Sequence, residues 1–237
     1  RSLYIARFQE NTEVSGLYVC ALCNSHLMGY YAKVKFEQFD EFFPKIRLEH
    51  FRTLPIRRIN FTTPADERER LREKGVRLYD LCLNKGDTAC VLGFVKGHLN
   101  AETERSDVVH DLLAFLAEQM IEMNKAKGEE IRGFLRWLER EIEADIDGLK
   151  NKTALQHYYN LELNELIDLL KQNRRAIGVD PSGRDFQERL EREFSASLAK
   201  IKPLLSRIQK TDQLIDQVVY QLYGLTDEEI AVVEGTV

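Results

Sequence analysis

Residues that form tight turns are scarce in this chain. Its 237 residues include 13 glycines and 5 prolines, which is too few for an all-β protein with many turns and for a disordered or collagen-like chain. Hydrophobic residues make up 43% of the chain and charged residues 31%, so it can build a core and still expose a polar surface. The composition therefore indicates a helix-rich globular protein.

Cysteine is also scarce, with Cys20, Cys23, Cys82 and Cys90 as the only four. A chain of this length folds without disulfide bonds, which favours a reduced cytoplasmic protein over a secreted one. Residues 14–32 carry no formal charge, but several polar residues and two glycines interrupt them, at a high cost in hydrocarbon. We expect a buried helix there and no membrane anchor.

Glycine-rich phosphate loops are absent. Neither the P-loop pattern nor the dinucleotide-binding pattern occurs, which argues against kinases, nucleoside triphosphatases and Rossmann dehydrogenases. The Glu-x-Lys triplet of many metal nucleases is missing too, and acids such as Glu139, Glu141 and Glu143 have the spacing of a solvated helix face. We expect no cofactor site in this chain.

The Cys20-x-x-Cys23 spacing is the strongest indication of a metal or redox site. Both cysteines lie in an apolar helical run, whereas Cys82 and Cys90 are separated by seven residues. Buried small hydrophobic side chains are therefore the favoured interpretation, with zinc and redox chemistry as alternatives. The five histidines lack the His-x-x-x-His spacing of a helical metal site, so we expect no metal.

Charge is distributed unevenly along the chain. The formal net charge is −5, but the first 60 residues contain nine basic and six acidic side chains. Such asymmetry predicts two parts with different partners, divided near residues 60–64. Any nucleic-acid contact would depend on the local basic part, because the overall charge is acidic.

The hydrophobic spacing predicts a different structure for each part. Apolar residues at three- and four-residue steps predict a helix over residues 17–31, and the bracketing prolines Pro44 and Pro55 favour a short β or extended passage between them. This part is expected to be α+β. The rest is expected to be helical, starting at Thr63-Pro64-Ala65-Asp66, where the threonine hydroxyl would cap a helix that runs to about Asn84.

Heptad-like stripes dominate the helical part. One runs from Val109 to Met123 and another from Ile131 to Leu149, and a break at Gly128 predicts the two arms of a helical hairpin. A further long helix should follow Asp180-Pro181, with Pro203 kinking or dividing it. Two last helices are predicted over residues 212–223 and 226–233, the second opened by a Thr226–Glu229 capping box after Gly224 closes the first. The predicted fold is mainly α with a small α+β part. The α+β part comprises residues 1–62, and a helical domain with coiled-coil-like helices comprises residues 63–237.

Two stretches resemble a known family. Residues 17–59 contain LYVCALCNSHLMGYYAKVKF and FFPKIRLEHFRTLPIRRI, which resemble the closing half of a DNA target recognition domain. That domain occurs in type I restriction specificity subunits and in fused type II restriction-modification adenine methyltransferases. The family usually has Leu-Asn-Ser at the helix, whereas this chain has Leu22-Cys23-Asn24-Ser25-His26-Leu27. Residues 211–230, TDQLIDQVVYQLYGLTDEEI, are similar to the C-terminus of the fused type II enzymes.

The resemblance implies a DNA sequence-specificity portion that is not catalytic by itself. It would position an adenine-N6 methyltransferase, and in some enzymes an endonuclease, located in a missing N-terminal portion. S-adenosylmethionine would belong to that portion, because the Asn-Pro-Pro-Tyr type motif is absent here. The partners implied are double-stranded DNA and the methyltransferase or endonuclease portion of the same enzyme.

Basic residues after the first helix are the candidate DNA contacts. Arg and Lys bind phosphates, and Arg also reads guanine edges. The seven candidates are Lys33, Lys35, Lys45, Arg47, Arg52, Arg57 and Arg58. Asn24 and Ser25 are assigned mainly to packing within a buried helix. The alternative is that the seven basic side chains only balance neighbouring acidic side chains on a solvated surface and contact no DNA.

The acidic helical part is expected to act as a spacer between a recognition domain and a catalytic one. Its helices could also support a homodimer or docking on the methyltransferase. The main alternative for the whole chain is a helical protein-interaction scaffold that binds no DNA. A small metal-dependent enzyme is a third class, and it depends on Cys20 and Cys23 alone.

Overall fold

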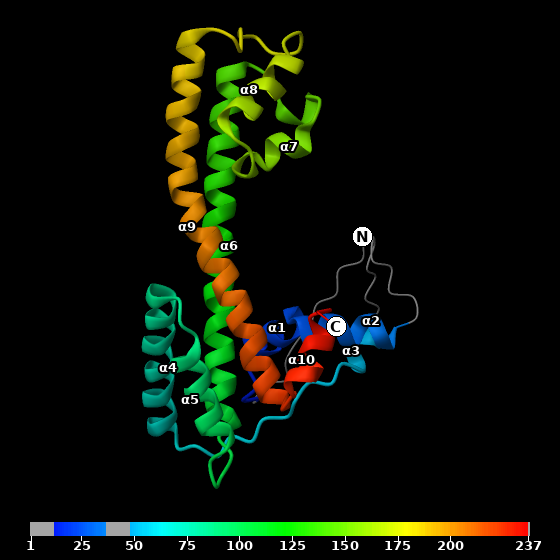
Figure 1. Ribbon diagram of the computed structural model, residues 1–237, viewed down its shortest axis with the longest axis vertical. Coiled ribbons are helices and arrows are strands. Elements are labelled where there is room, and N and C mark those ends of the chain that lie inside the picture. Colours follow the sequence, from blue (N-terminus) through cyan, green and yellow to red (C-terminus); the bar gives the residue numbers. More distant parts are fainter. Residues whose placement is uncertain (1–11, 37–47, 237) are drawn as a thin grey trace. The chain divides into compact units, whose positions relative to one another are not determined.

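The computed structural model describes residues 12–36 and 48–236. These residues form α-helices joined by loops and short 3-10 turns, with no β-strand among them (Figure 1). The mainly α prediction is confirmed, and the small β part is not observed in the described residues. No helix in these two ranges combines the length and the apolar character needed to cross a bilayer.

The chain forms two compact units, of which the first combines both ends of the chain. Unit 1 comprises residues 1–120 and 210–237. The α4 and α5 helices of this unit pack side by side, as do α1 and α2 (Figure 1). Its described helices are α1 (Gly16–Asn24), α2 (His26–Lys35), α3 (Leu48–Arg52), α4 (Ala65–Lys85), α5 (Ala89–Leu99), the start of α6 (Ser106–Ile142), the end of α9 (Arg184–Tyr223) and α10 (Asp227–Val233).

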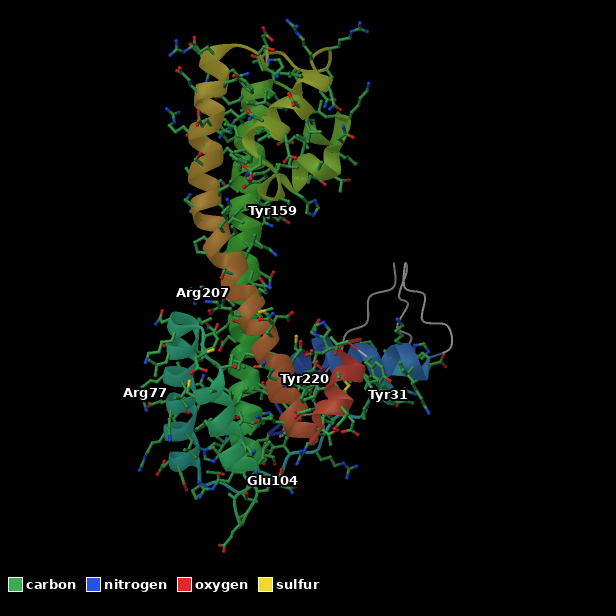
Figure 2. The ribbon with its side chains drawn as sticks, viewed as in Figure 1. Tyr31, Arg77, Glu104, Tyr159, Arg207 and Tyr220 are labelled. Carbon is green, nitrogen blue, oxygen red and sulfur yellow. The ribbon has the colours of Figure 1, made fainter. Side chains whose placement is uncertain are left out.

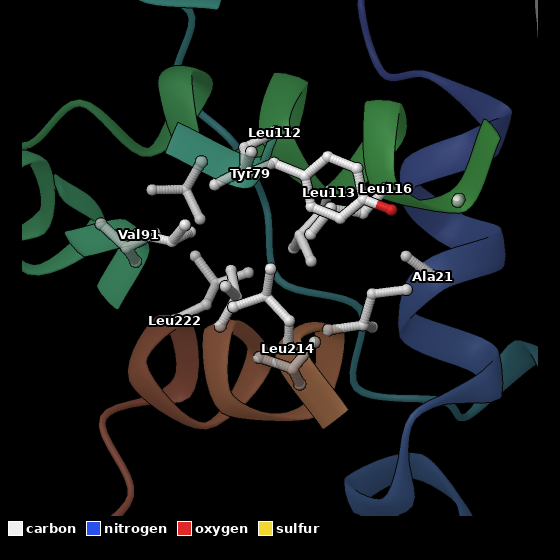
Figure 3. Close-up of a cluster of buried hydrophobic side chains, with 14 of the residues drawn as sticks. Ala21, Tyr79, Val91, Leu112, Leu113, Leu116, Leu214 and Leu222 are labelled. Atoms are coloured by element: carbon white, nitrogen blue, oxygen red, sulfur yellow. The ribbon is translucent and has the colours of Figure 1, made fainter. Parts of the chain in front are cut away.

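The core of unit 1 is built from helices that are far apart in the sequence. Figure 3 shows side chains of α1, α4, α5, α6 and α9 converging, and the labelled residues are Ala21, Tyr79, Val91, Leu112, Leu113, Leu116, Leu214 and Leu222. Tyr79 is 1% exposed, and its hydroxyl lies 2.8 Å from Oγ1 of Thr211. The residues that follow position 210 therefore complete a core that α1 to α6 begin.

Unit 2 comprises residues 121–209. The remainder of α6 and the first part of α9 form an antiparallel pair, joined by ion pairs between Lys200 and Glu130 at 3.0 Å and between Arg189 and Glu141 at 2.9 Å. The connecting segment contains α7 (Lys152–Gln156), α8 (Leu163–Gln172) and the 3-10 turns η1 (Ile146–Gly148) and η2 (Tyr158–Asn160). This segment packs on the helix pair and closes a second core.

An aromatic group marks the centre of the unit 2 core. The Phe134 ring stacks on that of Tyr158 with centroids 4.0 Å apart, and Phe194 contacts both rings. The Tyr158 hydroxyl, fully buried, lies 2.5 Å from Oγ of the buried Ser197. Each of these polar groups satisfies the other inside the core.

Gly128 does not end a helix, and Pro203 does not divide one. The α6 helix runs unbroken through Gly128, so the expected two arms are one helix, and α9 runs through Pro203 to Tyr223. A helical glycine costs only about 1 kcal/mol, and a proline removes one backbone hydrogen bond at a cost of about 3 kcal/mol. Burial of side chains on both sides, such as Leu138 and Ile201 at 0% exposure, outweighs these local costs.

The first part of the chain also departs from the prediction. The described part of the passage between Pro44 and Pro55, residues 48–54, contains the short helix α3 and no strand. The helix predicted over residues 17–31 ends at Asn24, because Ser25 takes an extended conformation and starts α2. Thr63 does not cap α4, since its hydroxyl donates to Asp107 at 2.9 Å.

Several predicted helix ends are confirmed. The capping box of α10 is present, with the Glu229 amide donating to Thr226 Oγ1 at 3.3 Å and the Thr226 amide donating to the Glu229 carboxylate at 2.9 Å. Gly224 follows α9 with a φ of 70°, the left-handed conformation that favours glycine. Ile56 and Ile59, before the predicted boundary at residues 62 and 63, pack on the same core as α4 and α6.

Candidate nucleic-acid interface

Residues 17–35, the start of the first stretch that resembles a target recognition domain, lie in two short helices that meet at Ser25. Ser25 is 3% exposed, and its hydroxyl donates to the Leu22 carbonyl at 2.7 Å while accepting from the Met28 amide at 3.4 Å. It ends α1 and caps α2 with one side chain. Asn24 is exposed and donates from its amide to the Cys20 carbonyl at 2.8 Å. The Asn-Ser pair therefore forms a helix junction instead of the middle of a buried helix.

Residue 26, where this chain departs from the family pattern, contacts the second stretch. The His26 amide donates to Asp216 Oδ1 at 2.8 Å, and the imidazole Nδ1 contacts Asp216 Oδ2. Asp216 lies on α9 and is 5% exposed. The hydrogen bond and charge of this carboxylate raise the pKa of His26 above its ordinary value. The two stretches that carry the resemblance are thus joined inside unit 1.

An extended segment over residues 53–63 is tied to the same unit by two tyrosines, the buried Tyr18 and the half-buried Tyr223. The Tyr223 hydroxyl donates to the Pro55 carbonyl at 2.7 Å and accepts from the Arg57 amide at 3.1 Å. The Tyr18 hydroxyl donates to the Arg57 carbonyl at 3.1 Å. Burial raises the pKa of both tyrosines, so both hydroxyls keep their protons and their donor roles at neutral pH.

Asp107 holds the other end of the extended segment. It is fully buried, and its carboxylate accepts from the Thr62 amide at 3.0 Å and from the Thr63 amide at 2.7 Å. The amide of Val108 donates to the same side chain at 2.9 Å. These bonds fix where the segment enters α4, so the basic residues before it sit on an ordered backbone.

The predicted DNA-contact residues occupy different places on this frame. Lys33 and Lys35 are exposed on the last turn of α2, and Arg52 is exposed at the end of α3. The Phe36 ring stacks on His50 with centroids 4.0 Å apart, which brings the end of α2 to α3. The structure therefore gathers these three cations on the α2–α3 corner.

Arg57 and Arg58 point to different surroundings. The Arg57 guanidinium donates to the Glu104 carboxylate at 2.6 Å, and Glu104 lies in the loop before α6 (Figure 2). Arg58 is exposed and pairs with no acidic side chain in the described part of the chain. Arg58 is therefore the more accessible of the two. Lys45 and Arg47 lie outside the described residues.

Acidic side chains of α10 lie beside the basic residues of α2. The α10 helix packs against α2 and carries Asp227, Glu228 and Glu229 in its first turn. A phosphate backbone that approached over α10 would meet this repulsive group. Among the described residues, the exposed basic candidates are Lys33 and Lys35 on α2, Arg52 on α3 and Arg58, and the acidic α10 borders them at α2.

The most enclosed histidine is held by structural hydrogen bonds. His110 is 1% exposed, and its Nε2 accepts from the Ser15 amide at 2.9 Å while its Nδ1 donates to Asp111 at 2.8 Å. Arg68 donates to both oxygens of Asp111, at 2.5 and 3.1 Å. Burial alone would raise the pKa of Asp111, but the hydrogen bonds from His110 and Arg68 outweigh it and lower that pKa. Both ring nitrogens are occupied, so this cluster, which lines a cleft of about 510 Å³, has no free base.

The four cysteines differ in exposure. Cys20 is exposed and Cys23 is half-buried, so the prediction of two buried hydrophobic side chains is wrong for Cys20. Within residues 12–36 and 48–236, no three side chains of His, Cys, Asp or Glu are placed to share an ion. Cys82 is buried and Cys90 is exposed.

Sequence reasoning missed Asp107 and Asp216, the two buried acids that fix this region. Both stand beside runs of aliphatic residues, Asp107 before Val108-Val109 and Asp216 after Leu214-Ile215. A carboxylate within an apolar helix face is rarely buried without a partner. That pattern was the available signal, although it does not name the partner.

Comparison with known proteins finds one family model that is similar to part of the chain. A family model described as a domain of unknown function (DUF8810) matches residues 106–219. This range begins at the first residue of α6 and ends near the end of α9. No curated protein and no solved structure matches the chain.

Proposed function

We propose that this chain is the DNA sequence-specificity portion of a restriction-modification enzyme. It positions an adenine-N6 methyltransferase, and in some enzymes an endonuclease, and it is not catalytic by itself. Its partners are double-stranded DNA and the methyltransferase portion of the same cytoplasmic enzyme, which supplies the S-adenosylmethionine site. Contacts between copies through the helices would give a homodimer.

One observation carries the proposal. The two stretches with the family resemblance are about 150 residues apart in the sequence, yet they share one compact unit through the His26–Asp216 contact and the hydrogen bonds of Tyr223. Their joint packing supports the interpretation that they form one functional part.

The exposed cations supply the contact chemistry. Lys33, Lys35 and Arg52 on the α2–α3 corner and Arg58 beside it are candidates for phosphate contacts, which fix register on a duplex, and the arginines can read guanine edges. Arg57 reaches DNA only if it leaves Glu104. Lys45 and Arg47 remain candidates from the sequence. Unit 2 contributes the spacer.

A pair of matched variants tests the proposal. Arg52→Ala with Arg58→Ala should weaken binding of the chain to a mixed-sequence DNA duplex, and the log–log salt dependence should flatten by about 1 to 2 units because fewer counterions are released. The control is Arg132→Ala with Arg136→Ala, two exposed residues of unit 2 near Glu129 and Glu130, which should leave the slope unchanged. Absence of duplex binding by the unmodified chain would contradict the proposal and favour a helical interaction scaffold.

A further inference from the structure

Unit 2 has a hollow of about 470 Å³, and every charged side chain that lines it is basic. The segment after η1 contributes Lys150, and the end of α8 with the turn after it contributes Lys171, Arg174 and Arg175. All four are exposed. We call this feature the α8 hollow.

The α8 hollow is built by one buried side chain. Asn173 is 4% exposed. Its Oδ1 accepts from the Lys150 amide at 2.8 Å, and its Nδ2 donates to the carbonyls of Lys150 at 3.2 Å and Leu169 at 2.9 Å. A buried amide that makes three hydrogen bonds holds the two segments at a fixed distance. The hydrogen bonds between Asn173 and the Lys150 backbone therefore hold Lys150 at the end of α8, although the two residues are 23 positions apart.

Much of the positive charge in the hollow is available. Lys150 and Arg175 form no ion pair with a described acidic residue. Lys171 pairs with Asp168 at 3.1 Å and Arg174 with Asp180 at 3.6 Å, and in both pairs each side chain is at least 45% exposed. Such exposed pairs contribute only about 0–1 kcal/mol, so an anionic ligand can displace them at little cost.

Two other cavities of the described residues are lined by charges of both signs. The cleft beside His110 includes Glu13, Glu69 and Glu118 with Arg68 and Arg72. A second hollow of unit 2 includes Glu139, Glu143 and Asp145 with Arg136 and Arg140. In both, opposite charges cancel at short range, whereas the α8 hollow presents one sign in a chain of net charge −5.

The helix dipole explains only part of this arrangement. Cations near a helix C-terminus interact favourably with its partial negative charge, which accounts for Lys171 in the last turn of α8. Lys150 belongs to another segment and Arg175 lies beyond the helix end. These two residues widen the basic surface past the reach of the helix end.

We propose that the α8 hollow binds phosphates of the DNA backbone, which would make unit 2 a second DNA contact as well as a spacer. Lys binds phosphate as a point charge and Arg through paired N–H groups, and neither needs a base sequence. The inference rests on the proposed function, because it assigns a second site for the same duplex. Inorganic phosphate offers the same chemistry and is the other source of the anion.

The test compares two double variants in the intact chain. Lys150→Ala with Arg175→Ala should weaken binding to a mixed-sequence duplex and flatten the log–log salt dependence by about 2 units, one for each lost phosphate contact. Lys150→Arg with Arg175→Lys keeps both charges and should retain the slope. The Arg132→Ala with Arg136→Ala control should also retain it, and equal melting temperatures of all variants exclude a folding effect.

The outcomes separate this inference from the proposed function. The salt-dependence slope could stay unchanged in the Lys150 and Arg175 alanine variant while the Arg52 and Arg58 variant loses affinity. That result overturns the proposal that the α8 hollow binds DNA, and it does not contradict the proposed function. An unmodified chain that binds no duplex overturns both. Chemical-shift changes at Lys150 and Arg175 with inorganic phosphate but not with duplex identify free phosphate as the ligand and overturn the DNA assignment.

Discussion

Asp216 of α9 contacts His26, the first residue of α2, with both of its carboxylate oxygens. One oxygen accepts from the His26 amide and the other contacts the imidazole, although the two residues are 190 positions apart in the sequence. The first amides of a helix lack partners within the helix, so this carboxylate replaces water at a buried junction. Removing it by Asp216→Ala should lower the free energy of unfolding by about 1–2 kcal/mol, as measured by urea denaturation. Asp212→Ala, one turn earlier and exposed, is the matched control and should change stability much less.

The same pair predicts a pH dependence of stability. Because Asp216 raises the pKa of His26 in the folded protein, the stabilisation from the pair is fully present below about pH 6.5, the ordinary value of the unfolded histidine. It is lost as the pH rises through the raised folded pKa. The stability difference between the unmodified chain and the His26→Gln variant should therefore shrink between mildly acidic and mildly alkaline buffer. A difference that grows with pH would show that the imidazolium is not stabilised by Asp216.

The Arg57–Glu104 pair predicts an unequal response of two neighbouring arginines. Arg57→Ala alone should leave the salt dependence of duplex binding nearly unchanged, because the guanidinium is already paired at 2.6 Å. Glu104→Gln should release it and steepen the slope by about 1 unit if it then meets a phosphate. Arg58→Ala should flatten the slope in either background. Loss of slope in Arg57→Ala but not in Arg58→Ala would reverse our assignment of the accessible residue.

The Tyr158–Ser197 pair should show strong coupling in unit 2. Ser197→Ala leaves the Tyr158 hydroxyl buried without a partner and should cost about 1–3 kcal/mol of unfolding free energy. Adding Tyr158→Phe removes that hydroxyl, so the double variant should lose less than the sum of the two single variants. Additive losses in thermal or chemical denaturation would mean that the two oxygens do not share a hydrogen bond in solution.

Metal removal is expected to leave the fold unchanged. Structural zinc makes folding metal-dependent, and the described residues hold no cluster of three suitable ligands. The melting temperature should be the same with and without a chelator. A large decrease with EDTA would restore the Cys20–Cys23 metal site as a candidate, and Cys23→Ala should then reproduce the decrease without chelator.

Local sequence chemistry predicted helix ends better than helix continuity. The Thr226–Glu229 box and Gly224 act within one turn, so their effect is visible in the sequence. Gly128 and Pro203 carry equally clear local signals for a break, yet burial of apolar faces along α6 and α9 outweighs them. The short helix between Pro44 and Pro55 was missed because prolines mark the ends of a segment without specifying its interior.

Long-range contacts explain what the sequence could not predict about the sites. The basic residues at the α2–α3 corner were identifiable by type, but the pairing of Arg57 with Glu104 depends on a loop 47 residues away. The Asp216 cap and the α8 hollow likewise depend on partners brought together by folding. In each case the sequence contains the charge and the fold decides whether that charge is accessible.

The composition of unit 1 has a consequence for synthesis on the ribosome. Residues 121–209 form a contiguous unit, whereas residues 1–120 need residues 210–237 to complete their core. Unit 2 can therefore fold as it emerges, while Tyr79, Val91 and Leu113 wait for Leu214 and Leu222. Contacts between distant residues form late because the loop between them must first close. During translation the core formed by α1 and α4 to α6 stays incomplete until the end of α9 is released, and its unfilled apolar surface is open to aggregation and to chaperone binding in that interval.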